Sequence, residues 1–233
     1  SGVAPDEWGR FTSFHADDAG PNDRFGTGVS VDGDMLLVGA HRQDEAANDA
    51  GAAYLYARHR DGLETWEPVA KLMASDALAD DYLGKSVAIE GSIALAGAPG
   101  REYDRGIVYV FERDLGGPEA WGERTSFTAS SGDYGDKFGE SLDLSGDTAV
   151  VGAPKNYLDV PYHGSVFVYE RNHGGADHWG QTQWLLADVP GNRDRFGTSV
   201  AIDGDTIAVG APRHDHPAPD AGAVYVFERG LVT

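Results

Sequence analysis

The sequence predicts an all-β protein in which one unit of about 57 residues occurs four times. The first marker is a tryptophan that recurs 58, 55 and 58 residues apart, at Trp8, Trp66, Trp121 and Trp179. A glycine–alanine pair recurs with the same spacings, at Gly39, Gly97, Gly152 and Gly210. Helical periodicity is absent, and 32 glycines with 10% aromatic residues are typical of a β protein with many turns. The repetition indicates units that pack on one another in a tandem array.

The last copy shows how one unit is expected to fold. Residues 179–186 form a short strand, and a polar loop rich in Asp, Pro and Gly follows. Residues 196–203 alternate apolar and polar positions, and Gly204 then reverses the chain into a strand at 206–212. A loop leads to the most apolar strand, at 221–229. Each unit therefore contains four strands.

The other copies contain the same elements in the same order. Their tight turns are DGD, EGS and SGD, at 32–34, 90–92 and 145–147. Their apolar strands lie at 53–58, 107–113 and 165–171. Tandem four-stranded antiparallel units predict a four-bladed β-propeller with one sheet per blade, whereas the coils of a β-solenoid are shorter. We expect one domain over 1–233, with repeats at approximately 8–65, 66–120, 121–178 and 179–233.

The positions of the first and last strands suggest how the ring closes. The chain begins with a tryptophan strand at 8–14 and ends after the apolar strand at 222–229. If the tryptophan strand is the outer strand of each blade, strand 8–14 completes the last blade and closes the ring. The repeated tryptophans are then expected to pack between blades, rather than to serve as platforms for sugars.

Two segments carry a family resemblance. FGESLDLSGDTAVVGAP at 138–154 and FGTSVAIDGDTIAVGAP at 196–212 each contain both halves of a known repeat motif, and 25–41 and 83–99 match it more loosely. The chain thus resembles the FG-GAP repeat family, which includes the β-propellers of integrin α subunits. In that family a longer loop between the first two strands often binds calcium. Here that loop is a tight turn with too few oxygens for the ion, and four copies differ from the seven blades of integrins.

The composition excludes several classes of function. The formal net charge is −20, with 38 acidic against 18 basic residues, so nucleic acids would be repelled. The absence of cysteine excludes disulfides and thiol nucleophiles. No segment has the roughly 20 apolar residues of a membrane helix. We expect an extracellular or cell-surface location without membrane insertion, and the sequence contains no signal peptide.

An aspartate two residues before each (F/L)-G pair is the candidate metal ligand. The four copies are Asp23, Asp81, Asp136 and Asp194. Fourfold repetition near the inner edge of a ring would offer carboxylates to a hard cation, and Ca²⁺ is the one cofactor suggested. Alternatively, each aspartate accepts backbone N–H bonds and shapes the turn into its blade, which explains why every copy has one.

The loop before each apolar strand differs most between copies and supplies the candidate ligand-binding residues. Histidine, tyrosine and acidic side chains in it are suited to stacking and hydrogen bonding: His41, Asp49, Tyr103, Asp104, Tyr157, Tyr162, His163, His214, Asp215, His216 and Asp220. The i, i+2 spacing of His214 and His216 would bring two imidazoles toward one metal, or both are ordinary surface histidines.

Three functions are compatible with these patterns. The first is a non-catalytic binding module that uses an acidic loop face in adhesion or extracellular recognition of a protein or glycan. The second is a glycan-binding lectin assisted by calcium. The third is a polysaccharide-acting enzyme or its accessory domain. The sequence has no nucleophile elbow, phosphate-binding glycine loop or H-E-x-x-H motif, so we expect no catalysis.

Overall fold

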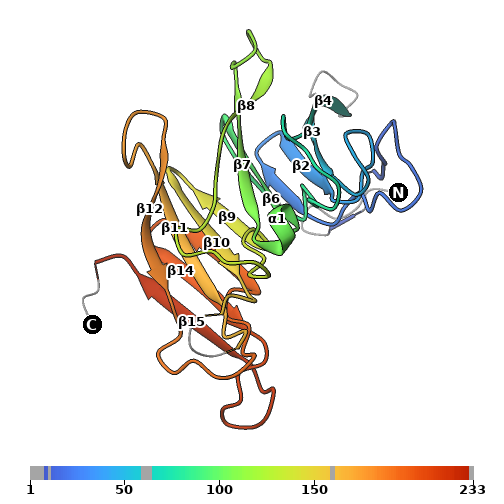
Figure 1. Cartoon of the computed structure of the whole chain (residues 1–233). Helices are drawn as coiled ribbons and strands as arrows, with labels where there is room; N and C mark the ends of the chain where they lie inside the picture. Colours follow the sequence, from blue (N-terminus) through green and yellow to red (C-terminus); the bar gives the residue numbers. More distant parts are fainter. Residues whose placement is uncertain (1–7, 10–11, 59–64, 158–160, 231–233) are drawn as a thin grey trace.

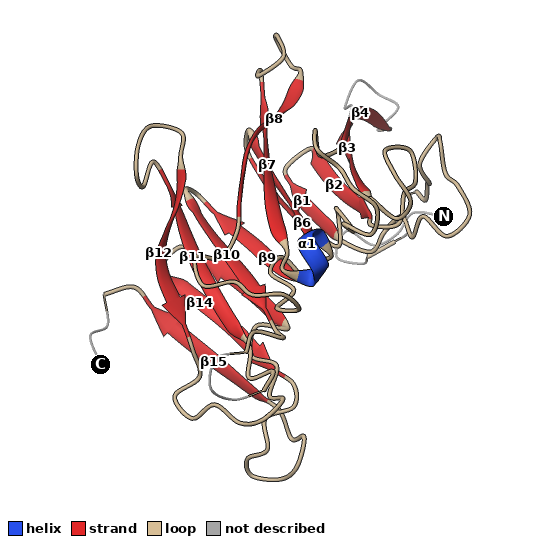
Figure 2. Cartoon of the chain, in the orientation of Figure 1, coloured by secondary structure: helices blue, strands red, loops and turns tan. Residues whose placement is uncertain are grey.

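The computed structural model describes residues 8–9, 12–58, 65–157 and 161–230. Strands form nearly all of its regular structure, and one short helix, α1 (Arg101–Asp104), interrupts them (Figure 2). In chain order the strands are β1 (Val29–Asp32), β2 (Met35–Ala40), β3 (Ala52–Arg58), β4 (Trp66–Leu72), β5 (Ser86–Glu90), β6 (Ile93–Ala98), β7 (Ile107–Arg113), β8 (Trp121–Phe127), β9 (Ser141–Ser145), β10 (Thr148–Ala153), β11 (Ser165–Arg171), β12 (Trp179–Leu185), β13 (Ser199–Asp203), β14 (Thr206–Ala211) and β15 (Ala223–Glu228).

The strands form four antiparallel sheets, which are the blades of a four-bladed β-propeller (Figure 1). Blade 1 contains β1–β4, blade 2 contains β5–β8, blade 3 contains β9–β12 and blade 4 contains β13–β15. Within each sheet every strand pairs with its neighbour in sequence. This arrangement confirms the predicted fold class.

The tryptophan strand is the outer strand of the preceding blade, as predicted. β4 begins at Trp66, pairs with β3 and shifts its register between Leu55 and Tyr56. The pairs β7–β8 and β11–β12 repeat this shift. Such a shift is a β-bulge, which bends the outer strand and increases its twist. The sequence repeat and the structural blade are therefore out of phase by one strand.

Apolar side chains from consecutive sheets pack face to face. Between blades 2 and 3, the side chains of Leu95 and Val110 share one buried cluster with Phe138 and Leu142. Phe138 is fully buried, and its ring meets the ring of Phe127 at a centroid distance of 6.3 Å. Each such side chain contributes about 1.5–3 kcal/mol by leaving water. Burial of apolar side chains between blades therefore stabilises the fold.

The two repeated glycine motifs bring the backbones of neighbouring blades into contact. In three of the four (F/L)-G pairs the residue before the glycine bridges to the preceding blade, in the pairs Gly51–Leu83, Gly106–Phe138 and Gly164–Phe196. A Cβ atom added to Gly152 would lie 2.1 Å from the carbonyl oxygen of Gly197 in the next blade. Only glycine permits this approach, which explains the motif at Gly39, Gly97 and Gly152, each of which faces a following blade.

Blades 1 and 4 lie at opposite ends of the row of blades (Figure 1). Val31 of β1 is 66% exposed, whereas Ile89 at the equivalent position of blade 2 is 5% exposed. On blade 4, Val226 is 61% exposed, whereas the equivalent Val110 of blade 2 is fully buried. Among the described residues, the faces between consecutive blades are therefore covered, while the two end faces are open.

The structure does not place strand 8–14 against blade 4. The described residues of that segment (8, 9 and 12–14) form no strand, and the described sheet of blade 4 ends at β15. Phe14 packs instead on Tyr56 of blade 1, with ring centroids 4.7 Å apart. Residues 10–11 lie outside the described range. Closure of the ring by this segment stays a prediction.

Three of the repeated tryptophans pack against apolar clusters, and of these Trp179 is buried while Trp66 and Trp121 are partly buried. Trp179 belongs to the cluster between blades 2 and 3, and Trp66 and Trp121 pack against the apolar clusters nearer the N-terminus. Trp8 differs, because its side chain is fully exposed. The extra tryptophan, Trp184, stacks on Phe167. The tryptophans of the strands are thus packing residues.

Candidate functional site

Two sets of loops lie side by side on one side of the propeller, here called the loop face. One set joins the second and third strands of each blade, and the other leads from each blade into the next. Backbone hydrogen bonds connect the two sets: Tyr82 N–H donates to Asp49 O (3.1 Å), Lys137 N–H to Asp104 O (2.7 Å) and Arg195 N–H to Tyr162 O (3.2 Å). All six residues have left-handed φ values between 50° and 66°. The two sets of loops therefore share one face of the propeller.

The four repeated aspartates shape turns in the loop face. One carboxylate oxygen of each accepts the N–H of the residue three positions earlier at 2.7–2.8 Å: Gly20 to Asp23, Leu78 to Asp81, Asp133 to Asp136 and Gly191 to Asp194. All four aspartates are buried. The turn-forming interpretation therefore fits every copy.

Three of these aspartates also hold a partner from the next loop. The pairs are Asp81 with Arg101 (2.8 Å), Asp136 with Asn156 (2.6 Å) and Asp194 with His214 (2.9 Å). Burial raises the pKa of Asp136, although hydrogen bonds from Asp133 and Asn156 oppose the rise. Within the described ranges, no three His, Cys, Asp or Glu residues lie close enough together to share a metal ion. Calcium binding by the repeated aspartates stays a prediction.

A hollow of about 500 Å³, here called the tyrosine hollow, opens between the loops of blades 2 and 3. Its lining includes three tyrosines, three aspartates and a lysine: Tyr134, Tyr157, Tyr162, Asp104, Asp133, Asp136 and Lys155. The tyrosines are 70%, 58% and 44% exposed, in that order. Three exposed aromatic rings are therefore grouped around one hollow. Three predicted ligand-binding residues, Asp104, Tyr157 and Tyr162, meet here.

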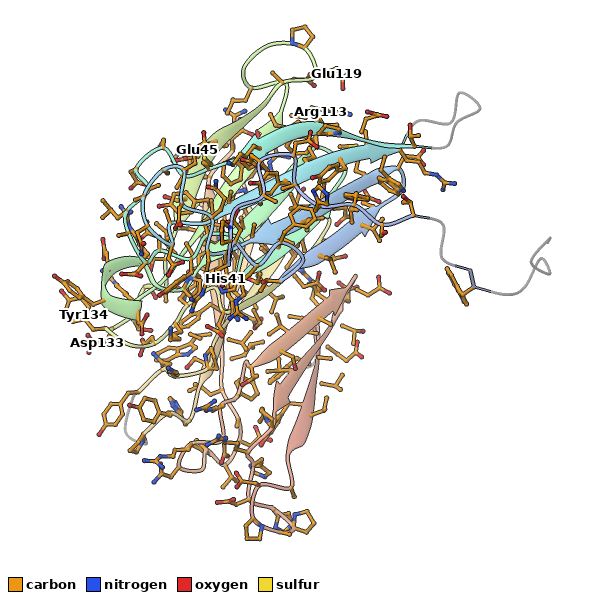
Figure 3. The ribbon with its side chains drawn as sticks, turned by 90° about the vertical axis from the view of Figure 1, so that its right-hand side faces the viewer. His41, Glu45, Arg113, Glu119, Asp133 and Tyr134 are labelled. Atoms are coloured by element: carbon orange, nitrogen blue, oxygen red, sulfur yellow. The ribbon has the colours of Figure 1, made fainter. Side chains whose placement is uncertain are left out.

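Tyr103 stands beside the tyrosine hollow on a strained turn. Its ring meets the ring of Tyr134 edge to face, at a centroid distance of 5.8 Å. Within α1, Glu102, Tyr103 and Asp104 have φ values of 51°, 59° and 66°. Left-handed φ values at such residues are costly and are common at ligand sites. The turn holds Tyr103 in solvent, and Figure 3 shows Tyr134 and Asp133 at the outer edge of the molecule.

A second hollow of about 450 Å³, here called the central cavity, receives side chains from all four blades. Five basic residues line it: Arg42 of blade 1, Lys85 of blade 2, Lys137 and Lys155 of blade 3, and Arg195 of blade 4. His41, Tyr82 and Glu140 lie among them, and Figure 3 shows His41 well inside the outline of the molecule. The loop face is thus not uniformly acidic, because basic side chains gather at its centre.

The acids near the central cavity neutralise only part of this charge. Lys137 makes an ion pair of 3.0 Å with Asp104. Lys85 is 3.8 Å from Glu140, and Arg42 is 3.9 Å from Asp49, which is beyond hydrogen-bonding distance. Lys155 and Arg195 have no ion pair within the part of the chain that the structure describes. The cavity therefore has an excess of positive charge.

The pKa of His41 reports this positive environment. Its Nδ1 lies 3.0 Å from the hydroxyl of Thr27. Burial, with smaller contributions from the positive charges of Lys85, Arg42 and Arg24, lowers the pKa to about 4. The imidazole is therefore neutral at pH 7. One of its ring nitrogens then donates a hydrogen bond and the other accepts one, and the tautomer decides which.

The remaining predicted ligand-binding residues do not line either hollow. His163 is buried, with Nδ1 3.0 Å from Asn156 O, so it supports a loop rather than facing solvent. His214 is held by Asp194, and His216 is exposed beside it. The acids form turns: Asp49 N–H donates to Asp44, and Asp220 N–H donates to Asp215. The structure thus divides the predicted set into surface and supporting residues.

Sequence reasoning missed the basic residues of the central cavity. The position directly before the (F/L)-G pair is basic in three of four copies, at Arg24, Lys137 and Arg195. The position after the G-A-P or G-A-H motif is also basic in three copies, at Arg42, Lys155 and Arg213. In a chain with only 18 basic residues, this repetition was a usable signal. Tyr134 was missed because it lies between Asp133 and Gly135, in a loop whose only candidate residue was the repeated Asp136.

Comparison with known proteins identifies the repeat. The model of a family described as FG-GAP repeat matches the chain four times, at residues 8–56, 66–111, 121–169 and 179–227. Each match begins with a repeated tryptophan and ends within the third strand of a blade. No curated protein matches the chain significantly. No described helix has the length and apolar character needed to span a membrane.

Proposed function

The chain belongs to the FG-GAP repeat family, and from this premise we propose that it is a non-catalytic binding module used in adhesion or extracellular recognition. FG-GAP propellers are typically interaction domains, and their repeats are typical of extracellular proteins. The loop face supplies the binding surface, because its loops differ between copies while the sheets beneath them are alike. Rigid scaffolds with variable loops commonly bind ligands in this way.

The observation that carries the proposal is the group of exposed tyrosines around the tyrosine hollow. Tyr103 and Tyr134 are 86% and 70% exposed, although an aromatic side chain gains free energy by burial. The left-handed turn that presents Tyr103 adds a further cost. A ligand that covers these rings would offset both costs in free energy.

A glycan is the ligand class that this surface favours. Tyrosine rings offer flat apolar faces to sugar rings, and their hydroxyls exchange hydrogen bonds with sugar hydroxyls. Asp104 and Asp133 of the hollow add acceptors for sugar hydroxyl groups. A protein ligand would use the same aromatic anchors.

A glycan array with the wild-type chain and two variants tests this function. Tyr134→Ala and Tyr162→Ala remove exposed rings, so both variants should keep the wild-type fold by circular dichroism. Each is expected to weaken glycan binding roughly 2- to 10-fold, from about 0.5–1.5 kcal/mol per aromatic contact. Trp8→Ala removes an exposed aromatic ring outside the hollow and serves as the matched control.

Two outcomes would contradict the proposal. A wild-type chain that binds no glycan on the array excludes the lectin, and the same variants are then tested against candidate protein partners. Release of sugar from the arrayed polysaccharides would show turnover and contradict a non-catalytic module. Loss of that turnover on substituting Asp133 would move the assignment to a polysaccharide-acting enzyme.

A further inference from the structure

We propose that the central cavity binds a small anion that carries two or more carboxylate, phosphate or sulfate groups. The inference rests on the proposed function of the loop face as a binding surface, and it assigns a second ligand class to a different part of that face.

Like charges converge on the central cavity. Each of the four blades contributes at least one basic side chain to the central cavity, and Glu140 is the only acid in its described lining. Like charges held close together repel, and the repulsion is larger where water is partly excluded. A multivalent anion in the middle would convert this repulsion into several charge-assisted hydrogen bonds.

The acids of the chain leave most bases of the central cavity without a close partner. With 38 acids available, structural pairing could have neutralised all five bases of the cavity. Instead Lys155 and Arg195 have no ion pair among the described residues, and Lys85 and Arg42 have acid partners only at 3.8 and 3.9 Å. Lys155 and Arg195 are therefore available to a ligand, and the acid partners of Lys85 and Arg42 lie beyond hydrogen-bonding distance.

The size and shape of the central cavity are those of a small-molecule site. A volume of about 450 Å³ falls within the roughly 300–1,000 Å³ of small-molecule sites. The guanidinium of Arg42 lies 5.9 Å from the centre of the Tyr82 ring, and the ring of His41 meets Tyr82 edge to face. These planar groups form one wall, which favours an organic anion such as a carboxylated or sulfated sugar over a single inorganic ion.

The pKa of His41 provides a second readout of anion binding in the central cavity. The neighbouring cations disfavour its protonated form, and its pKa of about 4 includes their effect. An anion placed among those cations would cancel part of their field and raise the pKa toward the ordinary 6.5 of histidine. The imidazole therefore reports occupancy of the cavity by NMR, independently of any binding heat.

The experiment is calorimetric titration of the intact chain with citrate, inorganic phosphate and sulfate, and with maltose as a neutral control. It is carried out at low ionic strength, because salt screens these charges. We expect citrate to bind, maltose not to bind, and added NaCl to weaken binding. Citrate should also raise the pKa of His41.

The double variant K155Q/R195Q tests the location of the site. It removes two cavity charges that have no ion pair among the described residues, so the fold should be kept, and citrate affinity should fall at least about tenfold. Arg193→Gln removes an exposed arginine from the same face outside the cavity, and its affinity should stay within about twofold of wild type, because screened surface charges contribute little.

Failure of citrate to bind the wild-type chain would overturn the inference, even if phosphate or sulfate bound, as would equal losses of citrate affinity in the double variant and in Arg193→Gln. Either result leaves the proposed function standing when the glycan array still responds to the tyrosine variants. Conversely, if the wild-type chain binds citrate but no glycan on the array, the anion site in the central cavity is supported and the glycan ligand is excluded.

Discussion

Replacing Gly152 by alanine tests how the blades are held together, and Gly210 is its matched control. The two glycines occupy the same position in β10 and β14, and a Cβ on either would lie 2.3 Å from a serine hydroxyl of its own blade. They differ in the next blade. The Cβ on Gly152 would lie 2.1 Å from the carbonyl oxygen of Gly197, whereas the one on Gly210 meets no following blade in the described residues.

The expected loss follows from these contacts. Overpacking against a fixed carbonyl costs about 1–3 kcal/mol. The new methyl group also displaces Ser141, whose hydroxyl donates to Gly197 O at 2.8 Å, and that hydrogen bond contributes about 0.5–1.5 kcal/mol. Gly152→Ala should therefore lower the free energy of unfolding by about 3 kcal/mol, or the melting temperature by roughly 6–12 °C. For Gly210→Ala the serine side chain can rotate away, so the change should be small.

Thermal and urea unfolding, followed by circular dichroism, measure both variants under the same conditions. Equal destabilisation by the two substitutions would refute the reasoning, because it would mean that a blade also packs on the open face of blade 4 in solution. A Gly152→Ala variant as stable as wild type would refute the close approach of the blades itself.

Three further measurements address the core, the central cavity and the metal prediction. Phe138→Ala, at a fully buried position, should lower the free energy of unfolding by about 3–5 kcal/mol; a urea midpoint near that of wild type would contradict the described packing. Lys85→Gln should raise the pKa of His41 in an NMR titration, because a neighbouring positive charge is lost; an unchanged value would leave burial as the cause. Calcium binding at the repeated aspartates predicts a melting temperature that a chelator lowers, and equal melting curves would leave them as turn-forming residues only.

The pH dependence of stability has a sign that follows from His41. The unfolded chain binds a proton there near pH 6.5, whereas the folded chain binds it only near pH 4. The unfolded state therefore binds more protons between these values, and the free energy of unfolding falls as the pH is lowered through them. His41→Gln should flatten this part of the profile. A variant with the wild-type profile would assign the dependence to other groups.

The fold could be predicted because the information is local and repeated. A tight glycine turn, an apolar strand and a tryptophan strand each follow from short-range patterns. Four copies at nearly constant spacing leave few architectures besides a propeller. Even the phase difference between repeat and blade followed from the order of strands, since β4 begins at Trp66. Closure of the ring by strand 8–14 stays a prediction, because it also depends on the angle between packed sheets.

The candidate site could be predicted only in part. The sequence alone determined the sheets, the turns and the set of loops that share a face, because strand order fixes where each loop emerges. Only the tertiary structure decided that Tyr134 joins Tyr162 in one hollow and that His163 is buried. It also brought basic residues from four distant segments into one cavity of a chain with a net charge of −20. A total charge carries no information about position, whereas an electrostatic site depends on which charges the packing of the blades brings together.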